Sequence, residues 1–265
     1  MGIALVTGGT SGIGATFARQ LAAKGDDIVL VARNKERLDQ MAHELRGMGR
    51  EVEVLPADLS KRADVAKVVK RLEDTAKPID MLVNNAGFGM HSKLSDADPS
   101  GHDFAFEVMV RSVRELAAAS ARAMRARGHG RIINVSSTAG FITMSSGYSS
   151  IKAWVTNFSE GLSNELYKTG VTVTALCPGW VHTEFHERAG ISKGGIPSWM
   201  WLDSESLVRS ALRDAERGKV ISIPSVRYKV LIWFARHLPR SVVRSVSRAI
   251  SSSRTASGSS STVTE

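Results

Sequence analysis

The sequence predicts an α/β fold, a doubly wound, seven-stranded parallel sheet with helices on both faces, in a single domain. Short apolar runs without polar alternation recur along the chain, which is typical of strands buried on both faces. Longer segments of helical spacing separate these runs as far as residue 224. With 265 residues, of which 43% are hydrophobic, the chain is long enough for one large domain with a sizeable core.

The predicted elements alternate as a parallel sheet with helical crossovers requires. Strands are expected at 3–6, 28–31, 52–55, 81–83, 132–135, 171–176 and 220–223. Helices are expected at 16–24, 35–48, 63–75, 104–127, 148–168 and 204–217. The segment 184–203 fits neither pattern, and a long insertion of this kind is typical of a substrate lid.

Composition divides the chain into three parts. Residues 1–225 form the predicted domain with its lid, 226–250 form a basic amphipathic extension, and 251–265 are rich in Ser and Thr and are expected to be disordered. The net charge is +9, but residues 226–265 hold seven Lys or Arg and one Glu, so the domain itself carries only +3. This distribution excludes a nucleic-acid-binding body.

The single cysteine, Cys177, cannot form an internal disulfide, which favours a reducing compartment. The apolar run at 3–6 is too short for a signal peptide or a membrane span. We therefore expect a cytoplasmic protein.

A glycine-rich turn joins the first predicted strand to the first helix. It comprises Gly8, Gly9, Thr10, Ser11, Gly12, Ile13 and Gly14. Glycines let backbone N–H groups approach a pyrophosphate, and the following helix N-terminus favours negative charge. The turn predicts a dinucleotide site.

The end of the second strand indicates which dinucleotide. An NAD site places a carboxylate there for the ribose 2′-hydroxyl, whereas this chain has Ala32 followed by Arg33 and Asn34. A guanidinium can pair with a 2′-phosphate through charge-assisted hydrogen bonds. We therefore predict NADP(H); the alternative is that Arg33 is a solvated surface side chain.

Four motifs in order resemble the short-chain dehydrogenase/reductase superfamily, in its single-domain Rossmann-like form. They are the Gly-x-x-x-Gly-x-Gly turn, Asn84-Asn85-Ala86-Gly87, Tyr148-x-x-x-Lys152 and Cys177-Pro178-Gly179. The resemblance implies a carbonyl reductase that forms a homodimer or homotetramer. It also implies that the nucleotide is bound by Gly8, Thr10, Ser11, Gly12, Ile13, Gly14, Arg33, Asn34, Asp58, Leu59, Asn85, Ala86, Gly87, Tyr148, Lys152, Pro178, Gly179, Val181 and Thr183.

Tyr148 and Lys152 lie four residues apart, on one face of a predicted helix. A nearby ammonium favours the phenolate, so we expect Lys152 to lower the pKa of Tyr148, which then gives its proton to a developing alkoxide. The resemblance implies that Lys152 also holds the nicotinamide ribose and that Ser137 polarises the substrate carbonyl. Ser136 is the alternative for that last role.

One position departs from the family pattern. Many members carry an asparagine in the long fourth helix, where it holds a water that links the lysine to solvent; counting back from Gly130 places Met109 there. A thioether is a weak acceptor and cannot donate. We expect an active enzyme; the alternative is a catalytically weak NADP(H)-binding protein that acts as a sensor or in membrane docking.

Two further segments indicate the class of substrate and a possible membrane contact. The lid is rich in apolar side chains, namely Trp180, Phe185, Ile191, Ile196, Trp199, Met200 and Trp201. These favour a lipophilic ketone of the 3-oxoacyl, fatty or steroid type, unless they dock the loop on the core. The extension 226–250 predicts peripheral membrane contact; the alternative is that it covers the lid or a subunit interface. No metal site is predicted.

Overall fold

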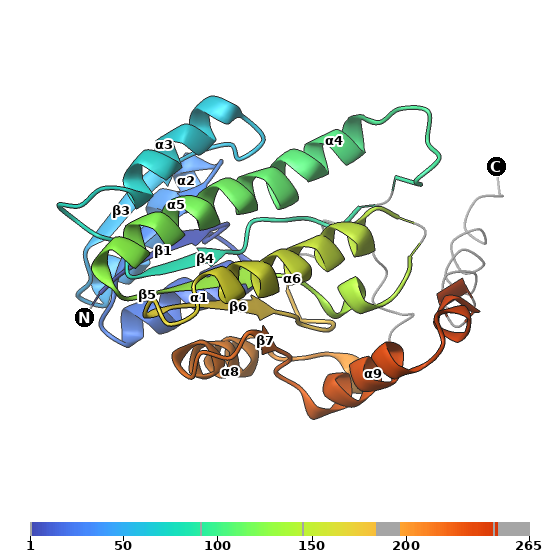
Figure 1. Ribbon diagram of the computed structural model, residues 1–265. Coiled ribbons are helices and arrows are strands. Elements are labelled where there is room, and N and C mark those ends of the chain that lie inside the picture. Colours follow the sequence, from blue (N-terminus) through green and yellow to red (C-terminus); the bar gives the residue numbers. More distant parts are fainter. Residues whose placement is uncertain (1, 91, 145, 184–196, 246, 249–265) are drawn as a thin grey trace.

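The computed structural model describes residues 2–90, 92–144, 146–183, 197–245, 247 and 248. All strand pairs in its seven-stranded sheet are parallel, and the order is β3-β2-β1-β4-β5-β6-β7 (Figure 1). The strands are β1 (Ile3–Thr7), β2 (Asp27–Ala32), β3 (Val52–Pro56), β4 (Met81–Asn84), β5 (Gly130–Val135), β6 (Val171–Leu176) and β7 (Ile221–Ser222). The order reverses between β1 and β4, which confirms the doubly wound prediction.

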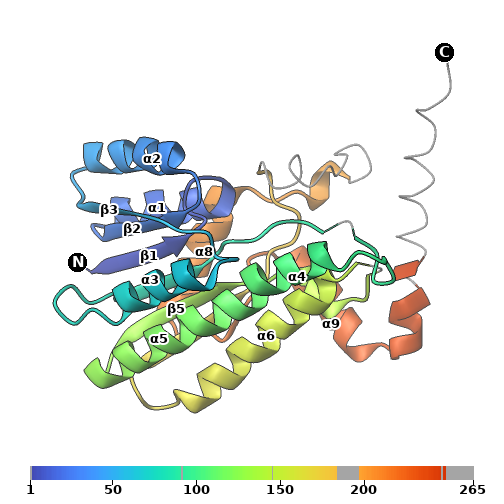
Figure 2. The same cartoon turned by 90° about the horizontal axis from the view of Figure 1, so that it is seen from above.

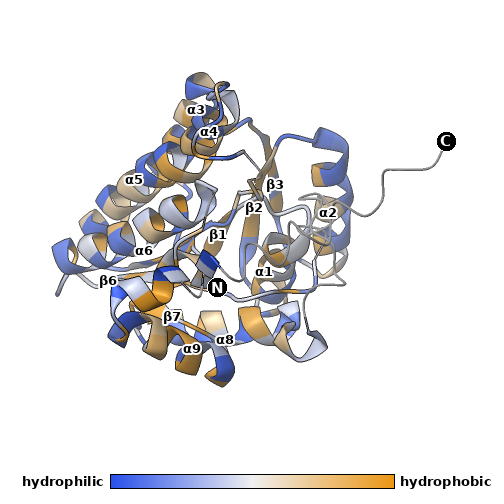
Figure 3. Cartoon of the chain, turned by 90° about the vertical axis from the view of Figure 1, so that its right-hand side faces the viewer, coloured by the Kyte–Doolittle hydropathy of each residue, from blue (hydrophilic) through white to orange (hydrophobic). Residues whose placement is uncertain are grey.

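Helices cover both faces of the sheet (Figure 3). One face carries α1 (Gly12–Ala23), α2 (Lys35–Gly47) and α8 (Ser204–Glu216), and the other carries α3 (Arg62–Leu72), α5 (Ser112–Arg127) and α6 (Tyr148–Glu165). Each face has its own apolar core, with Phe17 and Leu212 on the first and Leu72 and Leu116 on the second. Burial on both faces explains why the strands appear in the sequence as uninterrupted apolar runs.

The predicted helix 104–127 is interrupted. It consists of α4 (Ser100–Phe106), a π-helical turn η1 (Glu107–Arg111) and α5, which follow one another along one line (Figure 2). The hydroxyl of Ser112, the first residue of α5, donates back to the carbonyl of Val108 within this turn at 2.6 Å. A π-turn accommodates one extra residue in a helix and often marks a functional site. Met109 lies within it.

Helix α6 carries apolar side chains that differ in their burial. Ile151 and Leu162 are buried in the apolar core on this helix's face of the sheet, and Val155 is also buried. Trp154 and Phe158 are only partly buried, and their rings stack with centroids 4.9 Å apart.

The extension begins with α9 (Val226–His237), and residues 240–245 are again helical. None of the helices in the described ranges is long and apolar enough to cross a membrane. The predicted disordered tail, 251–265, lies outside the described residues.

The turn between α6 and β6 provides a test of the packing. Gly170 has φ +81°, and a Cβ added there would overlap the Gly128 carbonyl oxygen in the neighbouring turn before β5. We expect Gly170→Ala to lower the free energy of unfolding by about 2–3 kcal/mol, since a left-handed non-glycine residue is strained even without the overlap. Urea unfolding measures the change.

Gly161→Ala is the matched control. Gly161 lies inside α6, and a Cβ added there meets no atom within 4 Å. The alanine should stabilise the chain by about 0.5–1 kcal/mol because it favours the helix. Equal effects of the two substitutions would contradict the described turn.

Candidate active site

The parallel strands end at one edge of the sheet, so the residues that follow them gather there. The glycine turn after β1 is tight. Gly8 and Gly12 have φ +65° and +52°, and a Cβ added at Gly14 would overlap the Gly8 carbonyl oxygen. Ser11 precedes α1 as its N-cap residue. Only glycine fits this turn without strain, which leaves its backbone open to close approach by a ligand.

A residue that the sequence analysis did not single out, Thr7, joins this turn to the next. Its hydroxyl accepts from the backbone N–H groups of Asn85 and Ala86 at 2.9 and 3.0 Å and donates to the Val83 carbonyl at 3.3 Å. The Asn85 amide donates in return to the carbonyls of Thr7 and Gly8. A hydroxyl at the end of a buried strand, directly before the glycines, was the available signal.

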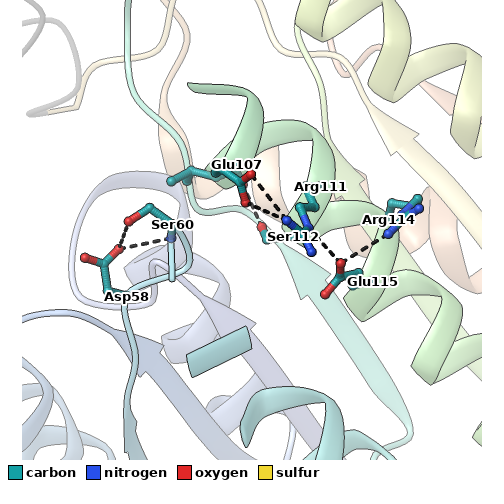
Figure 4. Close-up of polar contacts among 8 residues, drawn as sticks. Asp58, Ser60, Glu107, Arg111, Ser112, Arg114 and Glu115 are labelled. Atoms are coloured by element: carbon teal, nitrogen blue, oxygen red, sulfur yellow. Dashed lines mark hydrogen bonds and ion pairs between the residues drawn. The ribbon is translucent and has the colours of Figure 1, made fainter. Parts of the chain in front are cut away.

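Two cationic side chains, Arg33 after β2 and Lys61 after β3, lie near the Asp58 carboxylate. Arg33 is exposed, while the Asn34 side chain caps α2 by accepting from the Arg37 N–H at 2.9 Å. The Asp58 carboxylate accepts from the Ser60 N–H and hydroxyl at 3.0 and 2.8 Å (Figure 4).

Burial alone would raise the pKa of the Asp58 carboxyl. The hydrogen bonds from Ser60 and the charges of Arg33 and Lys61 nevertheless bring that pKa below its ordinary value. Asp58 is therefore held as an anion between two cations. Leu59, which follows it, is buried.

The segment after β6 closes the other side of the site. The Pro178 carbonyl accepts from the Thr138 N–H at 2.9 Å, and Val181 is buried and forms a bridge with Leu202. Thr183 lies against the glycine turn, because a Cβ added at Gly12 would come within 3.2 Å of the Thr183 Cβ. The structure thus brings together two motifs about 170 residues apart in the sequence.

Ser137, Tyr148 and Lys152 are grouped beside this segment. Ser137 is the extended residue before the short helix η2 (Thr138–Phe141), and its side chain forms a hydrogen bond with Tyr148, the first residue of α6. The Lys152 amine donates to the Val135 carbonyl at 2.9 Å and lies 5.6 Å from the centroid of the Tyr148 ring.

The pKa of Tyr148 shifts opposite to the predicted direction. Burial raises the pKa of Tyr148 to about 12, and the hydrogen bond with Ser137 offsets only part of this rise. Burial also lowers the pKa of Lys152 to about 8. The prediction that Lys152 lowers the pKa of Tyr148 is therefore wrong for the chain without a nucleotide, because burial raises the pKa of the Tyr148 phenol and only the hydrogen bond with Ser137 opposes it.

Ser136 has a different environment from Ser137. It is buried, and its hydroxyl donates to the Lys152 carbonyl at 2.7 Å and lies 2.7 Å from the Thr156 hydroxyl. Cys177, also buried, lies 3.8 Å from the same hydroxyl, and burial raises the pKa of its thiol to about 12. The Ser136 hydroxyl therefore joins the end of β5 to α6, whereas the Ser137 side chain bonds to Tyr148.

Met109 lies against the turn that Thr7 holds. Its side chain is 1% exposed, and a Cβ added at Gly87 would come within 3.2 Å of its sulfur. Met109 therefore packs beside the predicted nucleotide site.

Part of the predicted lid, residues 184–196 with Phe185, Ile191 and Ile196, lies outside the described residues. Within the described part, Trp201 stacks on His182 with ring centroids 4.7 Å apart and lies 6.0 Å from Trp180. Trp199, in the short helix η4 (Ser198–Met200), is 56% exposed. Trp180 and Trp201 therefore take part in aromatic packing, whereas Trp199 is exposed to solvent.

The sequence model of the short chain dehydrogenase family matches residues 2–193. A protein from Streptomyces virginiae, whose name gives it as a ketoacyl reductase of the monensin polyketide synthase, is 40% identical over 190 residues, which are 70% of this chain and 73% of that one.

Two solved structures are also similar. A short-chain dehydrogenase from Sphingobium yanoikuyae in complex with NADPH is 36% identical, with a TM-score of 0.81 over 89% of this chain and 94% of that one. The bulky-bulky ketone specific alcohol dehydrogenase from Comamonas testosteroni is 29% identical, with a TM-score of 0.76 over 100% and 96%.

The depressed pKa of Lys152 predicts a pH dependence of stability. An unfolded lysine keeps its proton up to pH ~10.5, whereas the folded chain releases it near pH 8. Between these values the unfolded state binds more protons, so this group makes the chain more stable as the pH rises. From pH 7.5 to 9.0, the free energy of unfolding should rise by about 1 kcal/mol relative to Lys152→Met.

Comparison with Lys152→Met cancels the contributions of other groups that lower the free energy of unfolding as the pH rises. Cys177 and Tyr148 have raised pKa values, so their contributions to stability fall as the pH rises above about 9 and 10. Both proteins carry these two groups. Parallel stability curves, from urea unfolding at each pH, would show that Lys152 keeps its ordinary pKa.

Proposed function

The chain belongs to the short-chain dehydrogenase family, and on this premise we propose that it uses NADPH to reduce a bulky, lipophilic ketone to an alcohol. The observation that carries the proposal is the grouping of Ser137, Tyr148 and Lys152 at the edge of the sheet that also holds the glycine turn. Support for a ketone comes from the ketoacyl reductase and the bulky-ketone dehydrogenase to which the chain is similar.

The residues at the sheet edge fit NADP(H). The left-handed glycines Gly8 and Gly12 leave room for a pyrophosphate above the start of α1. Exposed Arg33 at the end of β2 suits a 2′-phosphate, and an NADPH complex of a 36% identical relative supports the same choice. Thr183 beside Gly12 is placed for a further phosphate contact.

When bound, NADPH supplies a hydride to the carbonyl carbon. The protein must supply the proton. With a pKa of about 12, Tyr148 is a neutral phenol at physiological pH, the form that donates. The Ser137 hydroxyl, bonded to Tyr148, is placed to donate a second hydrogen bond to the same carbonyl oxygen and so to stabilise the negative charge that develops on it.

Lys152 has two roles in this proposal. Its amine can hold the ribose hydroxyls, and its pKa of about 8 lets it exchange a proton near neutral pH and restore the Tyr148 proton after turnover.

One observation favours a second candidate, an NADP(H)-binding protein with weak chemistry. Met109 fills the position of the family asparagine and is buried against Gly87. Its thioether offers no donor to a water that would link Lys152 to solvent. In that candidate the nucleotide binds normally, but turnover is slow.

The cofactor choice is tested at Arg33. We expect Arg33→Ala to raise the Kd for NADPH by about 10- to 100-fold, because charge-assisted hydrogen bonds contribute about 1.5–3 kcal/mol each. The Kd for NADH should stay within about two-fold, since NADH lacks the 2′-phosphate. Titration calorimetry with both nucleotides gives the comparison, and an equal change for the two would remove Arg33 from the site.

The chemistry is tested by ketone-dependent NADPH oxidation over a series of ketones of increasing bulk. Tyr148→Phe and Ser137→Ala should each lower kcat by about 10²- to 10⁴-fold, the usual contribution of a proton donor or a positioned hydrogen bond. The Ser137→Ala protein should keep its NADPH affinity.

Ser136→Ala is the matched control, because Ser136 adjoins Ser137 but faces α6. It should lower the free energy of unfolding by about 1–3 kcal/mol while kcat stays close to the wild-type value. Normal NADPH binding by the wild type without oxidation by any ketone would select the second candidate. A loss of kcat in Ser136→Ala equal to that in Ser137→Ala would refute the assigned roles.

A further inference from the structure

Helix α9 has an inner face that packs on the protein. Tyr228 and Ile232, one helical turn apart, are buried. The Tyr228 hydroxyl accepts from the Trp180 N–H at 3.0 Å and donates to the Met200 carbonyl at 2.9 Å, and a Cβ added at Gly179 would overlap its ring. This face fixes α9 to the segment that closes the site.

The opposite face of α9 is apolar and exposed. Val226, Val230, Trp233 and Phe234 are spaced i, i+4, i+7 and i+8, so they form one stripe, and they are 74%, 50%, 56% and 49% exposed. Isolated exposed apolar side chains are common, but a continuous stripe of large ones marks an interaction surface. Figure 3 shows apolar residues on α9, which lies at the rim of the molecule.

The surroundings of this stripe are basic. Lys229 and Arg236 flank it on one side, where they line a surface hollow with Ile232 and Trp233. On the other side Arg227 donates to the carbonyl of exposed Trp199. From residue 217 to 248 the sequence contains eight Lys or Arg and no Asp or Glu.

We propose that α9 docks the protein on an anionic lipid bilayer. Its outer stripe would enter the boundary between headgroups and acyl chains, and Lys229 and Arg236 would contact lipid phosphates. An apolar face with aromatic side chains and basic flanks is the pattern of interfacial helices, and each basic residue near an anionic surface adds to the attraction.

A second copy of the chain is a poorer occupant of this surface. In a two-fold contact the same patch meets itself, so Lys229 and Arg236 would face identical cations with no carboxylate nearby in the sequence to compensate. Charge complementarity therefore favours phosphate headgroups.

The docking surface lies beside the proposed site. The Arg236 guanidinium lies 5.6 Å from the centroid of the Phe141 ring, in the short helix that Ser137 precedes. A lipophilic ketone could therefore reach the site from the bilayer. This consequence rests on the proposed function, whereas the docking itself does not.

Vesicle sedimentation of the full chain tests the proposal. Vesicles of phosphatidylcholine and phosphatidylglycerol should pellet the protein, pure phosphatidylcholine should not, and added salt should release it. The pair Trp233→Ser and Phe234→Ser, and separately the pair Lys229→Glu and Arg236→Glu, should each weaken binding by at least about ten-fold. Tyr167→Ser, at a 74% exposed aromatic residue outside this surface, is the matched control and should bind as the wild type does.

Light scattering and NADPH titration accompany the sedimentation. All variants should bind NADPH equally, which shows that they are folded and separates a failure of docking from a failure of the proposed function. Equal pelleting of the wild type and both double variants, or no pelleting with anionic vesicles, would overturn the proposal. The stripe would instead belong to a contact between two copies of the chain under one result. In that result the wild type forms a dimer and does not bind vesicles, and the pair Trp233→Ser and Phe234→Ser dissociates the dimer.

Discussion

The buried amine of Lys152 is the contact on which the arrangement of the site depends. At 5% exposure the side chain is nearly removed from water, and an amine there is costly unless it is hydrogen-bonded. Its bond to the Val135 carbonyl ties α6 to the last residue of β5, and the bond from Ser136 to the Lys152 carbonyl adds a second tie. The bond from the Lys152 amine to β5 determines where Tyr148 lies above the sheet edge, whereas the bond from Ser136 contributes to the stability of the packing. The lowered pKa of Lys152 is the electrostatic consequence of this burial.

The sequence predicted those parts of the site that follow from local spacing. Glycines that must be left-handed, a tyrosine and a lysine one helical turn apart, and strands buried on both faces are all visible in a few consecutive residues. The direction of the Tyr148 shift was predicted wrongly because it depends on burial by segments distant in the chain. The π-turn around Met109 was missed because the apolar spacing of 104–127 continues across it.

Thr7 illustrates the same limit from another side. A threonine at the end of a strand is only a weak signal in a sequence, and its partners become known when the structure places Asn85 and Ala86 within hydrogen-bonding distance. The turn that contains Asn85 and Ala86 is hydrogen-bonded to Thr7 of β1 on one side. On the other side its Gly87 packs against the Met109 thioether. The hydrogen bonds of Thr7 therefore fix the position of the turn, and Met109 contributes packing to it.

Helix α9 shows why periodicity alone could not decide between a covering helix and a surface-binding one. Two apolar stripes lie on opposite sides of the same helix, and either could have packed inward. Tyr228 decides the outcome, because its hydroxyl finds both a donor and an acceptor in the segment after β6, and a phenol is rarely buried without such partners. The stripe of Trp233 and Phe234 must then face outward. Since the inner face is fixed by hydrogen bonds and packing, whatever binds the outer stripe also sets the orientation of the sheet edge that carries Ser137 and Tyr148.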